Sequence, residues 1–212
     1  MSQDIPPGEF HGLPGVELIT PGGARATVLL HGGHVTSWIA AGGPETVAQE
    51  QLYLSPRSSY GPGDAIRGGV PVIFPQFNAR GPLQRHGFAR NKPWELVSAQ
   101  QEGNAAHAVL RLRDDAESRA AWPHAFVLEL RVAIEGPTLE LSLSCQNSGD
   151  APLSFMAALH SYLRIGDLEA TRLHGLAGVT YWDSVADATL PQTQEWLQCE
   201  GDMDRIYFNV ES

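Results

Sequence analysis

Cysteine is scarce in this chain of 212 residues, with two in all, Cys145 and Cys199, far apart and without CxxC spacing. Two such residues provide neither a disulfide framework nor a zinc site. We therefore expect two reduced, partly buried thiols in a protein of the cytoplasm. Long apolar runs are lacking too: no stretch approaches the roughly 18 apolar residues of a membrane span, and residues 1–15 contain no signal-peptide core. These absences predict a soluble, cytoplasmic protein without a membrane partner.

Basic residues are also few. The chain has 14 lysines and arginines against 24 acidic residues, for a formal net charge of −10. Nucleic acids and anionic membranes require a cationic face, so this balance argues against both as partners. A small anionic ligand needs only a few arginines brought together locally, and basic residues do gather between positions 80 and 92.

The residues that are plentiful indicate a turn-rich protein with a real core. Apolar residues make up 42% of the chain, and 22 glycines and 15 prolines are spread along it. The clearest strand signal lies between residues 125 and 147. Apolar residues occupy the even positions from 126 to 134 and the odd positions from 139 to 145, on either side of Gly136 and Pro137. Two runs of period two joined by a short turn predict a β-hairpin with one buried face.

Shorter runs of the same kind occur at 16–20, 26–30, 35–40, 94–99 and 106–113, and we expect further strands at 153–159 and 206–210. The one good helical candidate spans 115–122, where Pro123 stops it. Many short strands separated by turns predict an all-β sandwich or barrel. No repeat or linker divides the chain, so we expect a single domain over residues 1–212.

One long segment, 55–92, breaks the strand pattern. It is rich in proline, glycine and polar residues, and a loop of this length in a compact domain is usually functional or disordered. Because several aromatic and aliphatic residues lie within it, we predict a packed functional loop system. Arg67, Arg85, His86 and Arg90 belong to this segment. Arginine binds phosphate or carboxylate through a planar fork. The alternative for each arginine is an ordinary solvated surface position, but their grouping with a histidine favours a site.

His160 is the second candidate, at the end of the apolar stretch 155–159. It is either a satisfied core residue or a group that transfers a proton near neutral pH. His31 and His34 form an HxxH pair without further ligands at suitable spacing, so we predict no metal site there. His107, His124 and His174 occur in strand or turn contexts without supporting motifs, and we interpret these three as structural.

Eight motifs in order carry a family resemblance, and together they run from about residue 15 to the end of the chain. They are His34-Val35-Thr36-Ser37-Trp38, Leu54-Ser55-Pro56, Ile66-Arg67-Gly68-Gly69-Val70-Pro71, Phe74-Pro75-Gln76-Phe77, His86-Gly87-Phe88-Ala89-Arg90-Asn91, Trp122-Pro123-His124-Ala125-Phe126, Ala158-Leu159-His160-Ser161-Tyr162 and Asp204-Arg205-Ile206-Tyr207. In this combination the chain resembles the hexose-6-phosphate mutarotases (glucose-6-phosphate 1-epimerases), a branch of the aldose 1-epimerase superfamily.

The resemblance implies a galactose-mutarotase-like β-supersandwich that interconverts the anomers of a hexose 6-phosphate without metal or organic cofactor. It implies that His160 protonates the ring oxygen while a carboxylate takes the proton of the anomeric hydroxyl. The family's sugar-phosphate contacts carry over onto Arg67, Arg90 and Asp204, and His86 belongs to the same sugar-facing motif. A glutamine usually precedes that histidine, whereas this chain has Arg85, which either adds to phosphate binding or changes the preferred ligand.

The chain departs from the family pattern after Tyr207. The resemblance places the catalytic glutamate on a later strand, so we expect the general base and the last strands of the sandwich to be absent from this chain. The spacing of Glu195, Glu200 and Glu211 identifies no substitute. Three readings stay open: a truncated enzyme, a chain completed by a partner, and a non-catalytic sugar-phosphate binding or regulatory module. A purely structural β-sandwich is a weaker fourth.

Overall fold

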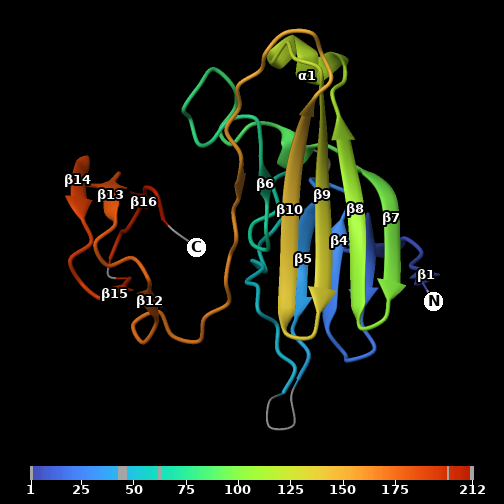
Figure 1. Cartoon of the computed structure of the whole chain (residues 1–212), viewed down its shortest axis with the longest axis horizontal. Helices are drawn as coiled ribbons and strands as arrows, with labels where there is room; N and C mark the ends of the chain where they lie inside the picture. Colours follow the sequence, from blue (N-terminus) through green and yellow to red (C-terminus); the bar gives the residue numbers. More distant parts are fainter. Residues whose placement is uncertain (1, 43–46, 62–63, 200, 211–212) are drawn as a thin grey trace. The chain divides into compact units, whose positions relative to one another are not determined.

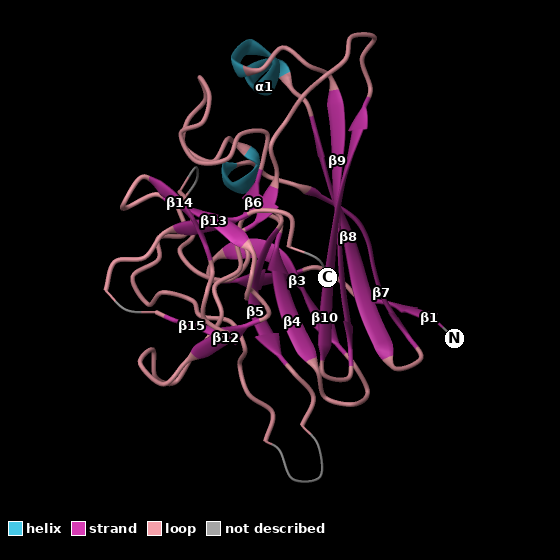
Figure 2. Cartoon of the chain, turned by 60° about the vertical axis from the view of Figure 1, so that its left-hand side comes forward, coloured by secondary structure: helices cyan, strands magenta, loops and turns pink. Residues whose placement is uncertain are grey.

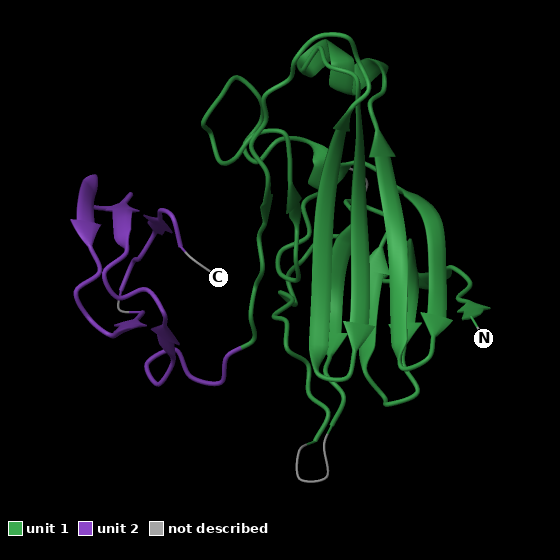
Figure 3. Ribbon diagram, in the orientation of Figure 1, with its two compact units in different colours: residues 1–164 green, residues 165–212 purple. Residues whose placement is uncertain are grey.

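The computed structural model describes residues 2–42, 47–61, 64–199 and 201–210. The chain forms two compact units, which Figure 3 colours separately: unit 1 spans residues 1–164 and unit 2 spans residues 165–212. The single domain expected over residues 1–212 stays a prediction. Among the described residues, no helix is long and apolar enough to cross a membrane.

The larger sheet of unit 1 is antiparallel, with strand order β1-β7-β8-β9-β10. Its strands are β1 (Ser2–Asp4), β7 (Glu95–Glu102), β8 (Ala105–Arg113), β9 (Phe126–Glu135) and β10 (Thr138–Asn147). The predicted hairpin is confirmed: β9 and β10 pair along their whole length, and Gly136 takes a φ of 53° in the turn. The even positions of β9 are fully buried, as the period-two pattern requires.

The second sheet has the order β2-β3-β4-β5 and lies face to face with the first (Figures 1 and 2). It consists of β2 (Gly8–Phe10), β3 (Leu13–Ile19), β4 (Arg25–Leu29) and β5 (His34–Ile39). Leu18 and Val28 from this sheet share one buried apolar cluster with Leu110, Leu130 and Val132 from the larger sheet. Burial of this shared layer, at about 25 cal/mol per Å² of apolar surface, holds the two sheets together. The all-β class is thereby confirmed.

The loop system between β5 and β7 carries few regular elements, as expected. They are the two-residue strand β6 (Val72–Ile73), which pairs with β11 (Ala158–Leu159), and the 3₁₀ turn η1 (Ala89–Asn91). The predicted helix is also confirmed as α1 (Ala116–Ala121). The Asp115 carboxylate accepts a hydrogen bond from the Ser118 amide at 2.7 Å, which caps its first turn.

The strand expected at 153–159 is wrong except for its last two residues, which are β11. Residues 154–157 are exposed, and the Met156 amide donates to the Pro75 carbonyl at 2.9 Å instead of joining a ladder. An apolar run that lies along a loop has no second strand to pair with, so its composition misleads.

Unit 2 contains two small sheets. In one, β12 (Arg172–His174) pairs with β15 (Trp196–Gln198); in the other, β13 (Thr180–Asp183) lies between β14 (Ala188–Pro191) and β16 (Arg205–Tyr207). The expected strand at 206–210 is thus β16, shifted toward the N-terminus. Arg205 fastens this sheet, since its Nε donates to Asp183 Oδ2 at 3.3 Å and its guanidinium lies 4.4 Å from the Tyr181 ring centroid.

Candidate active site

Backbone hydrogen bonds in unit 1 bring the two predicted site segments together. Because β11 pairs with β6, the chain after Leu159 runs beside the loop that precedes Val72. The His160 amide donates to the Pro71 carbonyl at 3.0 Å, and the Tyr162 amide donates to the Gly69 carbonyl at 2.8 Å. The candidate acid is therefore held next to the loop that carries Arg67.

That loop can make its turn only with glycine. Gly69 has a φ of 61°, and a Cβ there would lie 2.2 Å from the Val35 carbonyl oxygen. His34, fully buried beneath the loop, donates from Nε2 to the Gly68 carbonyl at 2.8 Å. Burial lowers the pKa of His34 from 6.5 to about 4, against the opposing effect of the Gly68 hydrogen bond. A neutral imidazole thus supports the backbone next to Arg67.

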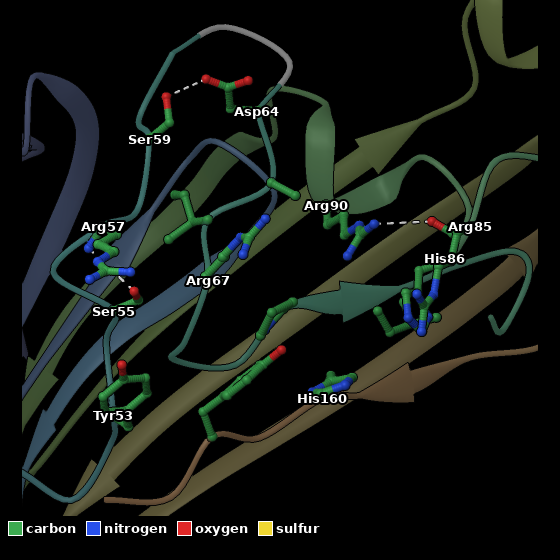
Figure 4. Close-up of a pocket in the computed structure, with 15 residues that line it drawn as sticks. Tyr53, Ser55, Arg57, Ser59, Asp64, Arg67, Arg85, His86, Arg90 and His160 are labelled. Carbon is green, nitrogen blue, oxygen red and sulfur yellow. Dashed lines mark hydrogen bonds between the residues drawn. The ribbon is translucent and has the colours of Figure 1, made fainter. Parts of the chain in front are cut away.

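The side chains of both segments line one open pocket of about 940 Å³ (Figure 4). Five of the six predicted site residues line it: Arg67, Arg85, His86, Arg90 and His160. The other pocket residues are Tyr53, Ser55, Arg57, Ser59, Asp64, Ala65, Ile66, Pro71, Ile73 and Tyr162.

Asp204, the sixth predicted residue, belongs to unit 2, just before β16. Its backbone carbonyl accepts hydrogen bonds from the amide and the hydroxyl of Ser184, at 2.9 and 3.1 Å. Its role as a sugar contact stays a prediction. Of the glutamates considered as substitutes for the general base, Glu200 and Glu211 lie outside the described residues, and Glu195 is exposed in unit 2.

Arg90 is the most constrained arginine of the pocket. Its Nη2 donates to the Arg85 carbonyl at 3.0 Å, while its Nε is buried without a hydrogen-bond partner among the described residues. Burial and the nearby Arg85 charge lower the pKa of Arg90, and the Tyr162 hydroxyl acts in the opposite direction. A bound anion would stabilise a partly buried guanidinium that has a donor without a hydrogen-bond partner.

The pocket is strongly cationic within an acidic chain. Four arginines line it, and the one described carboxylate in the lining, on Asp64, accepts a hydrogen bond from the Ser59 hydroxyl. In the described part of the chain, none of Arg57, Arg67 and Arg85 forms an ion pair, and neither does Arg90. The lining therefore offers several unneutralised guanidinium forks at one place.

His86 is held in a defined tautomer. Its backbone is left-handed, with a φ of 71°, and its Nδ1 accepts a hydrogen bond from the Asn78 amide at 3.2 Å. Burial, followed by the charges of Arg90 and Arg85, lowers the pKa of His86, so the ring is neutral at pH 7. An imidazole that accepts at Nδ1 carries its proton on Nε2. His86 can therefore donate a hydrogen bond from Nε2.

His160 lies against two rings in the same pocket. Its imidazole stacks on Tyr162 with centroids 4.7 Å apart and meets His86 edge to face at 5.9 Å. The ring is half-buried, which leaves access from the pocket. This packing limits the directions in which His160 can deliver a proton.

Arg57, Ser59 and Asp64 line the pocket but were not predicted as site residues. They lie between two family motifs, in a stretch that no motif marks, although it belongs to the loop system predicted to be functional. The paired histidines His31 and His34 both donate to backbone carbonyls, His31 to that of Asp64 at 2.9 Å. Both cysteines are free and half-buried.

Solved structures define the class of this fold. A structure described as "a putative mutarotase" from Salmonella typhimurium is 30% identical and superposes with a TM-score of 0.85, covering 98% of this chain and 68% of its own. A galactose mutarotase-like protein from Clostridium acetobutylicum, at 14% identity and a TM-score of 0.66, covers 88% of this chain and 63% of its own and shares the fold. The expected galactose-mutarotase-like fold is thereby confirmed.

Sequence comparison then gives the family. The profile of the aldose 1-epimerase family matches residues 14–210, and the chain belongs to that family. A protein from Cenchrus ciliaris named "Putative glucose-6-phosphate 1-epimerase" is 34% identical over 211 residues, covering 93% of this chain and 62% of its own length. A protein of the same name from Escherichia coli is 35% identical over 188 residues, with 87% and 60% covered. The chain thus spans about 60% of the length of these curated relatives.

Proposed function

We propose that this protein interconverts the α and β anomers of a hexose 6-phosphate by acid–base ring opening. The observation that carries the proposal is the convergence of the Arg67 and Arg90 forks with the His160 imidazole in one pocket. Because the chain spans about 60% of the relatives' length, the activity of the whole protein is part of the proposal. We also expect it to act in the cytoplasm, in keeping with its free thiols.

We assign the phosphate to Arg67 and Arg90, assisted by Arg85. In the view of Figure 4, Arg90 lies between Arg67 and Arg85. The unpartnered Nε of Arg90 is an available donor for a phosphate oxygen. Charge-assisted hydrogen bonds of this kind contribute about 1.5–3 kcal/mol each.

We assign proton donation to His160. In this step the imidazolium gives its proton to the ring oxygen, the bond from that oxygen to carbon 1 breaks, and the anomeric hydroxyl gives its proton to solvent water as the aldehyde forms. Rotation about the bond between carbons 1 and 2 then lets the ring close on the other face. We propose that the neutral His86, with its proton on Nε2, donates a hydrogen bond to the sugar, and that Asp204 is a further sugar contact.

The hydroxyl proton needs an acceptor, and we assign this role to no residue of the chain. Asp64, the described carboxylate of the lining, is engaged by the Ser59 hydroxyl. A second candidate function, which the four arginines of the lining favour, is a non-catalytic sugar-phosphate binding protein. A positioned general base commonly contributes about 10²–10⁴-fold in rate, so binding can persist where turnover is nearly lost.

Exchange spectroscopy separates the two functions. Glucose 6-phosphate at anomeric equilibrium is observed by proton NMR with and without the protein, and calorimetry gives its dissociation constant. Exchange between the anomeric signals faster than in buffer supports the epimerase. His160→Ala should remove that acceleration, whereas His107→Ala, on strand β8 and outside the pocket lining, should retain it. Binding without acceleration would support the binding protein, and an absence of both would refute both functions.

A further inference from the structure

Arg57 stands apart from the three arginines assigned to the phosphate. We propose, on the basis of the function inferred above, that Arg57 binds a second anionic group. The pocket would then accept a six-carbon sugar that carries a phosphate on carbon 6 and another anion at its opposite end. In the view of Figure 4, Arg57 and Arg85 lie at opposite ends of the arginine group, with Arg67 and Arg90 between them.

The backbone that carries Arg57 is fixed against the Arg67 loop. The Ser58 hydroxyl donates to the Arg67 carbonyl at 2.9 Å and accepts from the Arg67 amide at 3.1 Å. The Ser58 amide donates to the Ser55 carbonyl at 3.0 Å, and the Arg57 amide donates to the Ser55 hydroxyl at 3.3 Å. Arg57 thus projects from a hydrogen-bonded turn, which reduces the conformational entropy lost when it binds an anion.

The charges of the lining exceed what one phosphate neutralises. Arg57, Arg67, Arg85 and Arg90 contribute four positive charges and Asp64 one negative charge, which leaves a net charge of +3. A phosphate monoester carries about −1.5 to −2 at pH 7. A ligand with one phosphate therefore leaves about one positive charge without a partner, and a second anionic group on the ligand would neutralise it.

The surroundings of Arg57 also suit an anion. Tyr53 and Ser55 line the same pocket, and their hydroxyl groups can donate to phosphate or carboxylate oxygens. An exposed arginine is most often only solvated. Arg57 differs in that it lines a pocket with other arginines, and within the described ranges it has no carboxylate partner.

Such a ligand would act on the proposed reaction as an inhibitor when its ring cannot open. A hexose with phosphates on carbons 1 and 6 has no free anomeric hydroxyl. It would bind Arg57 as well as the three arginines assigned to the phosphate, and it would thereby exclude the substrate. The same pocket would thus respond to the concentration of a doubly charged sugar.

Calorimetry at one fixed ionic strength tests this inference. The ligands are α-glucose 1,6-bisphosphate and glucose 6-phosphate, and the proteins are the unaltered chain, Arg57→Gln, Arg57→Lys and Arg113→Gln. Arg113 lies at the end of β8, is exposed, and does not line the pocket, so its replacement removes the same charge elsewhere. The fixed ionic strength matters because salt screens exposed charges.

We expect the unaltered chain to bind the bisphosphate at least about tenfold more tightly than the monophosphate, as one additional charged contact would produce. Arg57→Gln should reduce this ratio to about one, Arg57→Lys should restore part of it, and Arg113→Gln should keep it. Equal affinities in the unaltered chain, or a ratio that Arg57→Gln does not change, would overturn the inference. A different result would refute the proposed epimerase function on which the inference rests. That result is that glucose 6-phosphate does not bind, or does not anomerise faster with the protein than in buffer.

Discussion

Replacing His34 by a residue that does not titrate tests whether burial keeps its imidazole neutral beneath the Arg67 loop. Its Nε2 donates to the Gly68 carbonyl at 2.8 Å beneath the glycine turn. In His34→Gln, the amide nitrogen of glutamine takes the place of Nε2, so the hydrogen bond can be retained while the titration is removed. The side chain of the variant stays neutral at every pH used.

The expected effect follows from the pKa of His34, which burial lowers from 6.5 to about 4. Between these values the unfolded chain binds a proton that the folded chain does not, so stability falls as the pH decreases. The contribution is fully present above pH 6.5 and is lost as the pH falls to about 4. At about 1.4 kcal/mol per pKa unit, the whole loss is about 3 kcal/mol, of which about 2 kcal/mol is lost by pH 5.

Urea unfolding at pH 7 and pH 5, followed by tryptophan fluorescence, measures this loss. The free energy of unfolding should fall by about 2 kcal/mol more in the unaltered chain than in His34→Gln. Comparing the two pH differences cancels any pH-independent cost of the substitution and the titration of all other groups. An equal pH dependence in both proteins would show that burial does not hold His34 neutral, and the reasoning would be refuted.

Three further predictions concern the pocket directly. His160→Ala should lower kcat for anomerisation by about 10²–10⁴-fold, with a much smaller change in Kd; full activity would remove His160 from the mechanism. Arg67→Ala or Arg90→Ala should weaken the binding of hexose 6-phosphate by at least about tenfold and the binding of free hexose far less. Equal losses of affinity for the two ligands in calorimetry would exclude a phosphate role for these arginines. Gly69→Ala should lower the free energy of unfolding by at least about 2 kcal/mol more than Gly103→Ala. Both glycines have positive φ, but of the two only Gly69 would bring a Cβ against backbone atoms. Equal losses of unfolding free energy would mean that the loop backbone shifts to accommodate the added Cβ.

The hairpin of β9 and β10 was predictable because its determinants are local. A strand buried on one face places every second residue in the core, and this period is visible in the residues themselves. In unit 2 the strands β12 to β15 were missed because they have three or four residues, too few to show a period. The run at 153–159 misled for the opposite reason, since its apolar composition is that of a strand but most of it has no pairing partner.

The sequence by itself determined the all-β class, the family resemblance and five residues of the candidate pocket, because residue periodicity and ordered motifs need no coordinates. Only the tertiary structure decided that Arg57 and Asp64 belong to the same pocket, that His34 is neutral beneath the Gly68 carbonyl, and that Arg90 keeps an unused donor. Each of these depends on contacts between residues far apart in the chain. Burial and the distance between charges arise only when those segments are folded together.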